Sequence, residues 1–128
     1  MRASWLMLHA SFQHPNLVKK QLPYIIKFLK QPNKHTGAIR NSIRLFQELD
    51  LPEKYSGELF DICINYTKNG TMPHAVRAFS INVLGLICKK YPDLKQEVLL
   101  ILNELESFPQ PPSITVCVKK TKKLIAKL

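Results

Sequence analysis

The sequence predicts an all-α protein, a right-handed α-solenoid of about three helical hairpins followed by a C-terminal capping helix. Apolar residues recur at intervals of three and four along most of the 128 residues, as in helices with one buried face. Glycines number only four, and strand-like alternation is scarce. Pro15, Pro52 and Pro92 divide three pairs of helical runs at intervals of 37 and 40 residues. A period of about 40 residues is typical of stacked helix pairs.

The first predicted hairpin, residues 2–31, consists of two apolar runs on either side of Pro15. The second run contains Pro23. Because proline disrupts a helix interior but fits the first turn, Pro23 is expected to break or restart this helix. The expected buried face is Leu22, Ile25, Ile26 and Leu29.

The second predicted hairpin, residues 36–69, repeats this arrangement around Pro52. It is expected to end in a turn with Gly70 just beyond the helix, a position where glycine is common. The expected buried faces are Ile39, Ile43, Phe46 and Leu49 in the first helix, and Leu59, Ile62, Cys63 and Tyr66 in the second.

The third predicted hairpin, residues 73–106, has the clearest helical pattern. Pro73 suits the first turn of its first helix, and Pro92 ends that helix. Asp93, followed three residues later by Gln96, is expected to be the N-cap of the second helix. The expected buried faces are Val76, Phe79, Ser80, Val83, Leu84 and Ile87, then Leu94, Val98, Leu99, Leu102 and Leu105.

A capping helix is predicted at residues 113–128, after the loop SFPQPP. The last helix of a stack must cover the preceding hairpin with one face and present polar side chains to water with the other. The apolar face is Ile114, Val118, Thr121, Ile125 and Leu128, and the polar face carries Lys119, Lys120, Lys122, Lys123 and Lys127.

The chain resembles HEAT-like, armadillo-type α-helical repeat proteins, including small uncharacterised bacterial HEAT-like proteins. The resemblance is carried by RASWLMLHASFQHPNL, IRNSIRLFQELDLP and VRAFSINVLGLICKKYPDL, and it covers nearly all of the chain. It implies a stack in which each unit contacts its neighbours and partners bind an extended surface.

Composition indicates one soluble, cytoplasmic domain, residues 1–128, with no metal and no cofactor. A chain of this length with 45% hydrophobic residues can bury a core, and no apolar stretch approaches the roughly 20 residues of a membrane span. Cys63, Cys88 and Cys117 lie far apart within apolar runs, which indicates buried free thiols in a reducing compartment. No Cys/His spacing matches a zinc site.

The net charge of +10 is concentrated at the two ends of the chain. Residues 1–47 hold eight Lys/Arg and no acid, residues 48–106 hold six Lys/Arg and nine acids, and residues 107–128 hold five Lys and no acid. This distribution fits an anionic partner, usually nucleic acid, and it equally fits solvated lysine that maintains solubility.

Three arginines are candidate partner-binding residues. Arg40 and Arg44 lie one turn apart in the second hairpin, and Arg77 begins the third. Together on one surface they would favour an acidic protein segment. In the alternative interpretation, each arginine binds carbonyl or carboxylate groups of its own protein and packs its stem over apolar surface.

Seven lysines are candidate anion-binding residues. Phosphate contacts require cations spread along one surface, and no acid lies in the same segments of the sequence. The lysines are Lys19, Lys20, Lys27 and Lys30 in the first hairpin and Lys119, Lys120 and Lys123 in the last helix.

No catalytic residue is assigned. The acidic cluster Glu48, Asp50, Glu53, Glu58 and Asp61 fits hairpin corners and helix starts, where carboxylates favour the helix dipole. The sequence therefore predicts a non-catalytic module or scaffold that binds proteins through the solenoid surface. Nucleic-acid binding through the basic N-terminal hairpin and C-terminal helix is the alternative.

Overall fold

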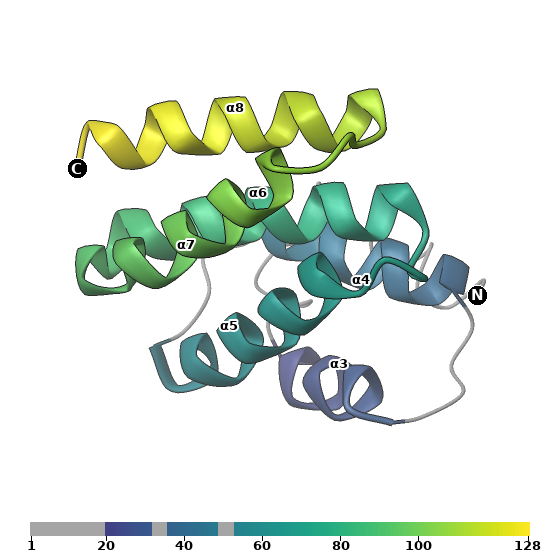
Figure 1. Ribbon diagram of the computed structural model, residues 1–128. Coiled ribbons are helices and arrows are strands. Elements are labelled where there is room, and N and C mark those ends of the chain that lie inside the picture. Colours follow the sequence, from purple (N-terminus) through teal and green to yellow (C-terminus); the bar gives the residue numbers. More distant parts are fainter. Residues whose placement is uncertain (1–19, 32–35, 49–52) are drawn as a thin grey trace. The chain divides into compact units, whose positions relative to one another are not determined.

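The computed structural model describes residues 20–31, 36–48 and 53–128, and every regular element in these ranges is a helix (Figure 1). The predicted all-α class is confirmed. The predicted first helix of the first hairpin lies outside the described residues. The α-helices are α3 (Leu22–Leu29), α4 (Thr36–Glu48), α5 (Glu53–Lys68), α6 (His74–Lys90), α7 (Lys95–Glu106) and α8 (Pro112–Ala126), and a 3-10 turn, η1, covers Pro92–Leu94.

The chain divides into two compact units, Met1–Ile62 and Cys63–Leu128. In the first unit α3 packs against α4. Pro23 lies in the first turn of α3, which begins at Leu22, a position that suits proline. The buried face of α3 is also the predicted one, Leu22, Ile25, Ile26 and Leu29. A single repeat domain over residues 1–128 stays a prediction.

The core of the first unit includes one face of α4. Ile39, Ile43 and Phe46 are buried as predicted, whereas Leu49 lies outside the described residues. The hydroxyl of Ser42, also buried, donates to the carbonyl oxygen of Ala38 over 2.8 Å. This bond satisfies the hydroxyl within its own helix, so a polar residue is accommodated in the core.

The second unit is built around α6, which is buried on two faces. The first face is the predicted one, and five of its six residues are fully buried. A second buried face, which the periodicity did not predict, contains Arg77, Ile81, Gly85 and Cys88. Because more than one face of α6 is covered, α6 has the burial pattern of a central helix and not of a surface helix.

Helix α8 lies beside α6 and runs parallel to it (Figure 1). The side chain of Asn82 hydrogen-bonds Cys117, and further along both helices Gly85 approaches Thr121. A Cβ atom at Gly85 would lie 3.1 Å from Cγ2 of Thr121. The absence of a side chain at Gly85 therefore permits this close approach of the two helices.

The start of α7 differs from the prediction. Asp93 lies inside η1, and α7 begins at Lys95 with Leu94 as its N-cap and no side-chain cap bond. The predicted N-cap at Asp93 is wrong, because the chain passes from η1 into α7 with Leu94 and Lys95 already in helical conformation. Asp93 is instead part of the 3-10 turn that leads into α7, one residue before the position that precedes the helix. On the buried face, Val98, Leu102 and Leu105 are joined by Ile101.

Helix α8 covers α6 and α7 with its apolar face, as expected of a capping helix. Four of the five predicted residues, Ile114, Val118, Thr121 and Ile125, are buried, and the fifth, Leu128, is exposed.

In the described parts of the chain, no helix combines the length and the apolar character that a membrane span requires.

Candidate binding surfaces

Arg40 and Arg44 project from α4 into solvent. Both are exposed, whereas their neighbours Asn41, Ile43 and Leu45 are buried. The buried neighbours fix the rotation of α4, and a spacing of four residues places the two arginines one turn apart on one face. Neither arginine forms an ion pair within the described part of the chain. Arg40 and Arg44 thus form an exposed basic pair on one face of α4.

Arg77 has a different environment. It is only 7% exposed, and its Nε donates over 3.2 Å to the carbonyl oxygen of Thr67 in the last turn of α5. Carbonyl groups in the last turn of a helix have no partner within that helix, and a cation there favours the helix dipole. Burial lowers the pKa of Arg77. Arg77 thus binds a carbonyl group of its own protein, as in the alternative interpretation of these arginines.

The lysines of the first hairpin are exposed where the structure describes them. Lys20, Lys27 and Lys30 are exposed, and Lys19 lies outside the described residues. Nζ of Lys30 lies 2.6 Å from Oε2 of Glu58 on α5. Although the sequence holds no acid close to Lys30, the fold brings one from α5, in the next hairpin.

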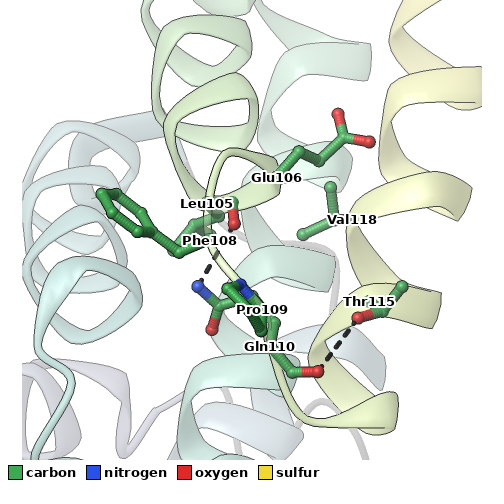
Figure 2. Close-up of a pocket in the computed structure, with 7 residues that line it drawn as sticks. All are labelled: Leu105, Glu106, Phe108, Pro109, Gln110, Thr115 and Val118. Atoms are coloured by element: carbon green, nitrogen blue, oxygen red, sulfur yellow. Dashed lines mark hydrogen bonds between the residues drawn. The ribbon is translucent and has the colours of Figure 1, made fainter.

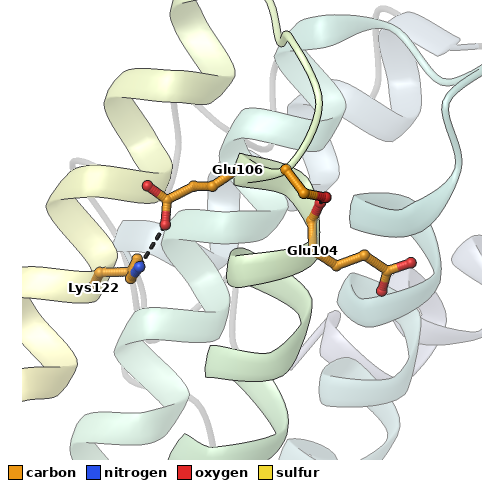
Figure 3. A network of polar contacts seen from close by, with 4 residues as sticks. Glu104, Glu106 and Lys122 are labelled. Atoms are coloured by element: carbon orange, nitrogen blue, oxygen red, sulfur yellow. Dashed lines mark hydrogen bonds and ion pairs between the residues drawn. The ribbon is translucent and has the colours of Figure 1, made fainter.

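The lysines of α8 separate into two groups. Lys119, Lys120 and Lys123 are exposed and form no ion pair with described residues. Lys122 instead pairs with Glu106 at the end of α7 (Figure 3). The α8 lysines belong to the second unit and the first-hairpin lysines to the first. A single anion-binding face that contains the first-hairpin lysines together with the α8 lysines stays a prediction.

The corner between α7 and α8 contains a pocket of about 360 Å³, which was not expected from the sequence (Figure 2). Two hydrogen bonds hold its loop: Nε2 of Gln110 donates to the Leu105 carbonyl over 3.2 Å, and Oγ1 of Thr115 donates to the Gln110 carbonyl over 3.4 Å. The pocket is lined by Leu105, Glu106, Phe108, Pro109, Gln110, Thr115 and Val118.

Two large apolar side chains, one on α7 and one in the loop that follows it, are exposed to solvent. Leu100 is 71% exposed and Phe108 is 65% exposed. A signal for Leu100 was present in the sequence, because it lies outside the predicted buried face and at helical spacing between Glu97 and Glu104. We call Glu97, Leu100, Glu104 and Phe108 the outer face of α7.

The acidic and thiol groups that the structure describes form no metal-binding cluster. Glu53, Glu58 and Asp61 are exposed on α5, and in the described residues no group of three or more His, Cys, Asp or Glu could hold a metal ion. Burial raises the pKa of the Cys63 thiol, although a hydrogen bond with Ser80 opposes this shift. A nucleophilic thiol requires the opposite shift.

Comparison with known proteins supports the resemblance. A family model described as a HEAT repeat domain matches residues 1–125. No curated protein and no solved structure matches the chain. The resemblance expected from the sequence is therefore confirmed over nearly its whole length.

Proposed function

Because the chain belongs to the HEAT repeat domain family, we propose that it is a non-catalytic binding module that holds acidic protein segments. HEAT repeats generally mediate protein–protein interactions and are typically non-enzymatic scaffolds. The observation that supports an acidic partner is the exposed pair Arg40 and Arg44 on α4, which has no counter-charge in the described residues.

The spacing of this pair favours a particular kind of segment. Residues four apart in a helix are separated by roughly 6 Å along its axis. Alternate side chains of an extended chain are separated by about 6.6 Å and point to the same side. An extended Glu-x-Glu segment therefore presents two carboxylates at the spacing of Arg40 and Arg44, and each guanidinium can donate two parallel hydrogen bonds to one carboxylate.

The experiment is a fluorescence anisotropy titration of the protein with a labelled Glu-x-Glu peptide and with its Gln-x-Gln counterpart. We expect binding of the acidic peptide alone, and about tenfold weaker binding in the double variant Arg40→Gln/Arg44→Gln. The matched control is Lys20→Gln/Lys27→Gln, which removes two exposed cations from the same unit. Equal losses in both variants, or no binding, would overturn the proposal.

Nucleic-acid binding is the second candidate, and the exposed Lys119, Lys120 and Lys123 favour it. Titration of labelled duplex DNA and single-stranded RNA at several salt concentrations tests it. On duplex DNA, log K should fall against log salt with a slope of about −0.9 for each phosphate contacted. Substitution of these three lysines by Gln should reduce that slope. An unchanged slope would exclude α8 from the contact.

A further inference from the structure

The outer face of α7 combines apolar exposure with negative charge in a strongly basic chain. Leu100 and Phe108 are 71% and 65% exposed, and Glu97 and Glu104 are exposed beside them. The chain carries 19 Lys/Arg against nine Asp/Glu. The one basic residue within α7 is Lys95, in the first turn of the helix. Nζ of Lys95 lies 3.4 Å from the Leu128 carbonyl oxygen. The outer face thus differs in charge from most of the chain.

Helical geometry places these residues along one line. Glu97, Leu100 and Glu104 follow at intervals of three and four residues, which share a helix face. The opposite side of α7, which includes Val98, Leu102 and Leu105, is buried in the second unit. The Phe108 backbone N–H donates to the Leu105 carbonyl over 3.3 Å, so a tight turn connects Phe108 directly to the end of α7.

Two side chains of the outer face, those of Glu104 and Phe108, are directed away from α8. Figure 3 shows Glu104 pointing away from α8, whereas Glu106 points toward Lys122 of that helix. Figure 2 shows the Phe108 ring extending away from Val118. Lys122 neutralises Glu106, but Glu97 and Glu104 form no ion pair with described residues. Among the residues that the structure describes, no cation therefore compensates the charge of Glu97 and Glu104.

We propose that the outer face of α7 docks a basic amphipathic helix of another protein, whose apolar side chains cover Leu100 and Phe108 and whose Lys or Arg residues pair with Glu97 and Glu104. This inference rests on the proposed binding function and adds a second surface with the opposite charge preference to that of Arg40 and Arg44. Exposed apolar residues framed by charge are typical of protein contacts. Amphipathic helices bind through apolar anchors at helical spacing.

Charge complementarity decides between classes of partner. Two uncompensated carboxylates repel phosphate, so nucleic acid and anionic lipid surfaces are disfavoured at this face. A cationic partner gains from Glu97 and Glu104 in both encounter rate and orientation, while Leu100 and Phe108 supply the apolar contact. A basic amphipathic protein segment satisfies both requirements.

The test uses the full chain and three labelled synthetic helices. The first helix has a Leu stripe and Lys on its other positions, the second replaces Lys with Glu, and the third replaces Leu with Ala. We expect the Leu/Lys helix to bind at least about tenfold more tightly than either of the others. Leu100→Ser/Phe108→Ser should weaken its binding about tenfold. Glu97→Gln/Glu104→Gln should weaken it several-fold at low salt, and this loss should shrink as salt screens the charges.

Matched control variants distinguish binding at the outer face of α7 from nonspecific binding of a basic peptide elsewhere on the protein. Val116→Ser removes an apolar side chain that is 63% exposed on α8, and Glu53→Gln/Asp61→Asn removes two exposed acids from α5. Both controls should bind like the unaltered protein. Losses in the controls equal to those in the outer-face variants, or no binding of the Leu/Lys helix, would overturn the proposal.

Two further outcomes would overturn this inference in different ways. If light scattering shows that the protein self-associates and that Leu100→Ser/Phe108→Ser restores a monomer, the occupant is a second copy and the proposal of a separate partner fails. If the Leu/Lys helix fails to bind while the Glu-x-Glu peptide still binds through Arg40 and Arg44, this inference fails and the proposed function stands.

Discussion

Arg77 and Thr67 connect α6 to the last turn of α5 through one hydrogen bond, from Nε of the arginine to the carbonyl oxygen of the threonine over 3.2 Å. Both residues are buried. The hydroxyl oxygen of Thr67, in contrast, has no hydrogen-bond partner in the described structure. The junction between the two helices therefore contains one satisfied and one unsatisfied polar group, and mutation distinguishes their effects on stability.

Arg77→Ala should lower the free energy of unfolding by about 1–3 kcal/mol, because it removes the donor to a buried carbonyl and the packing of a long side chain. The matched control is Arg44→Ala, an exposed arginine on α4, which should change stability by less than about 0.5 kcal/mol. Urea denaturation of the three proteins measures the difference. Equal effects of the two substitutions would contradict the structural role of Arg77.

Thr67→Val should leave stability unchanged or raise it by up to about 1 kcal/mol. The substitution keeps the shape of the side chain and removes a hydroxyl that is buried without a hydrogen bond, and such a group carries a desolvation cost. The same urea titration measures this change. A clear loss of stability would show that the hydroxyl has a partner, such as a bound water.

Leu84→Asp should prevent folding of the second unit, because Leu84 is 0% exposed and an unpaired buried charge costs several kcal/mol, roughly. Leu86, two residues further along α6, is 39% exposed. The control Leu86→Asp should therefore retain a cooperative thermal transition. Circular dichroism melts compare the two variants, and a native-like melt of Leu84→Asp would contradict the assigned core.

Gly85→Ala tests the close approach of α6 and α8. Alanine favours the helix by about 1 kcal/mol, but its Cβ would lie 3.1 Å from Cγ2 of Thr121, and such crowding costs a comparable amount. A Thr121→Ser background removes this methyl group but leaves Cδ2 of Leu124 at 3.2 Å. Gly85→Ala should therefore be more favourable there by about 0.5 kcal/mol. A double-mutant cycle that shows no coupling would contradict this contact.

Burial of Cys88 predicts a loss of stability at alkaline pH. Burial raises its pKa from 9.0 to about 11. Between these values the unfolded chain loses the thiol proton and the folded chain keeps it, so the free energy of unfolding falls by up to about 1.4 kcal/mol per pH unit. Below pH 9 this thiol is protonated in both states and has no effect.

Urea denaturation from about pH 8 to about pH 11 checks this prediction against Cys88→Ala. Burial also raises the pKa of Tyr66, from 10.0 to about 12. Tyr66 therefore lowers the stability of both proteins above about pH 10. The substituted protein should lose less stability over this window. Identical slopes for the two proteins would show that Cys88 titrates normally.

The helices and most of their buried faces could be predicted because they depend on local periodicity. The stripe Leu22, Ile25, Ile26 and Leu29 is buried in α3, and Val98, Leu102 and Leu105 are buried in α7. Spacing of three and four places such residues on one face whatever the neighbouring elements are. Of the candidate sites, the exposure of Arg40, Arg44 and the α8 lysines follows from the same local pattern.

Contacts between distant residues could not be predicted in this way. Gly85 is buried where α8 covers a second face of α6, and Lys30 meets Glu58 from another helix. The sequence by itself therefore determined the helical class, the helix order and one buried face of most helices, since these follow from neighbouring residues along the chain. Only the tertiary structure decided that Arg77 is used inside the protein, that a pocket forms at the α7–α8 corner, and that Leu100 and Phe108 stay uncovered, because each depends on which elements pack together.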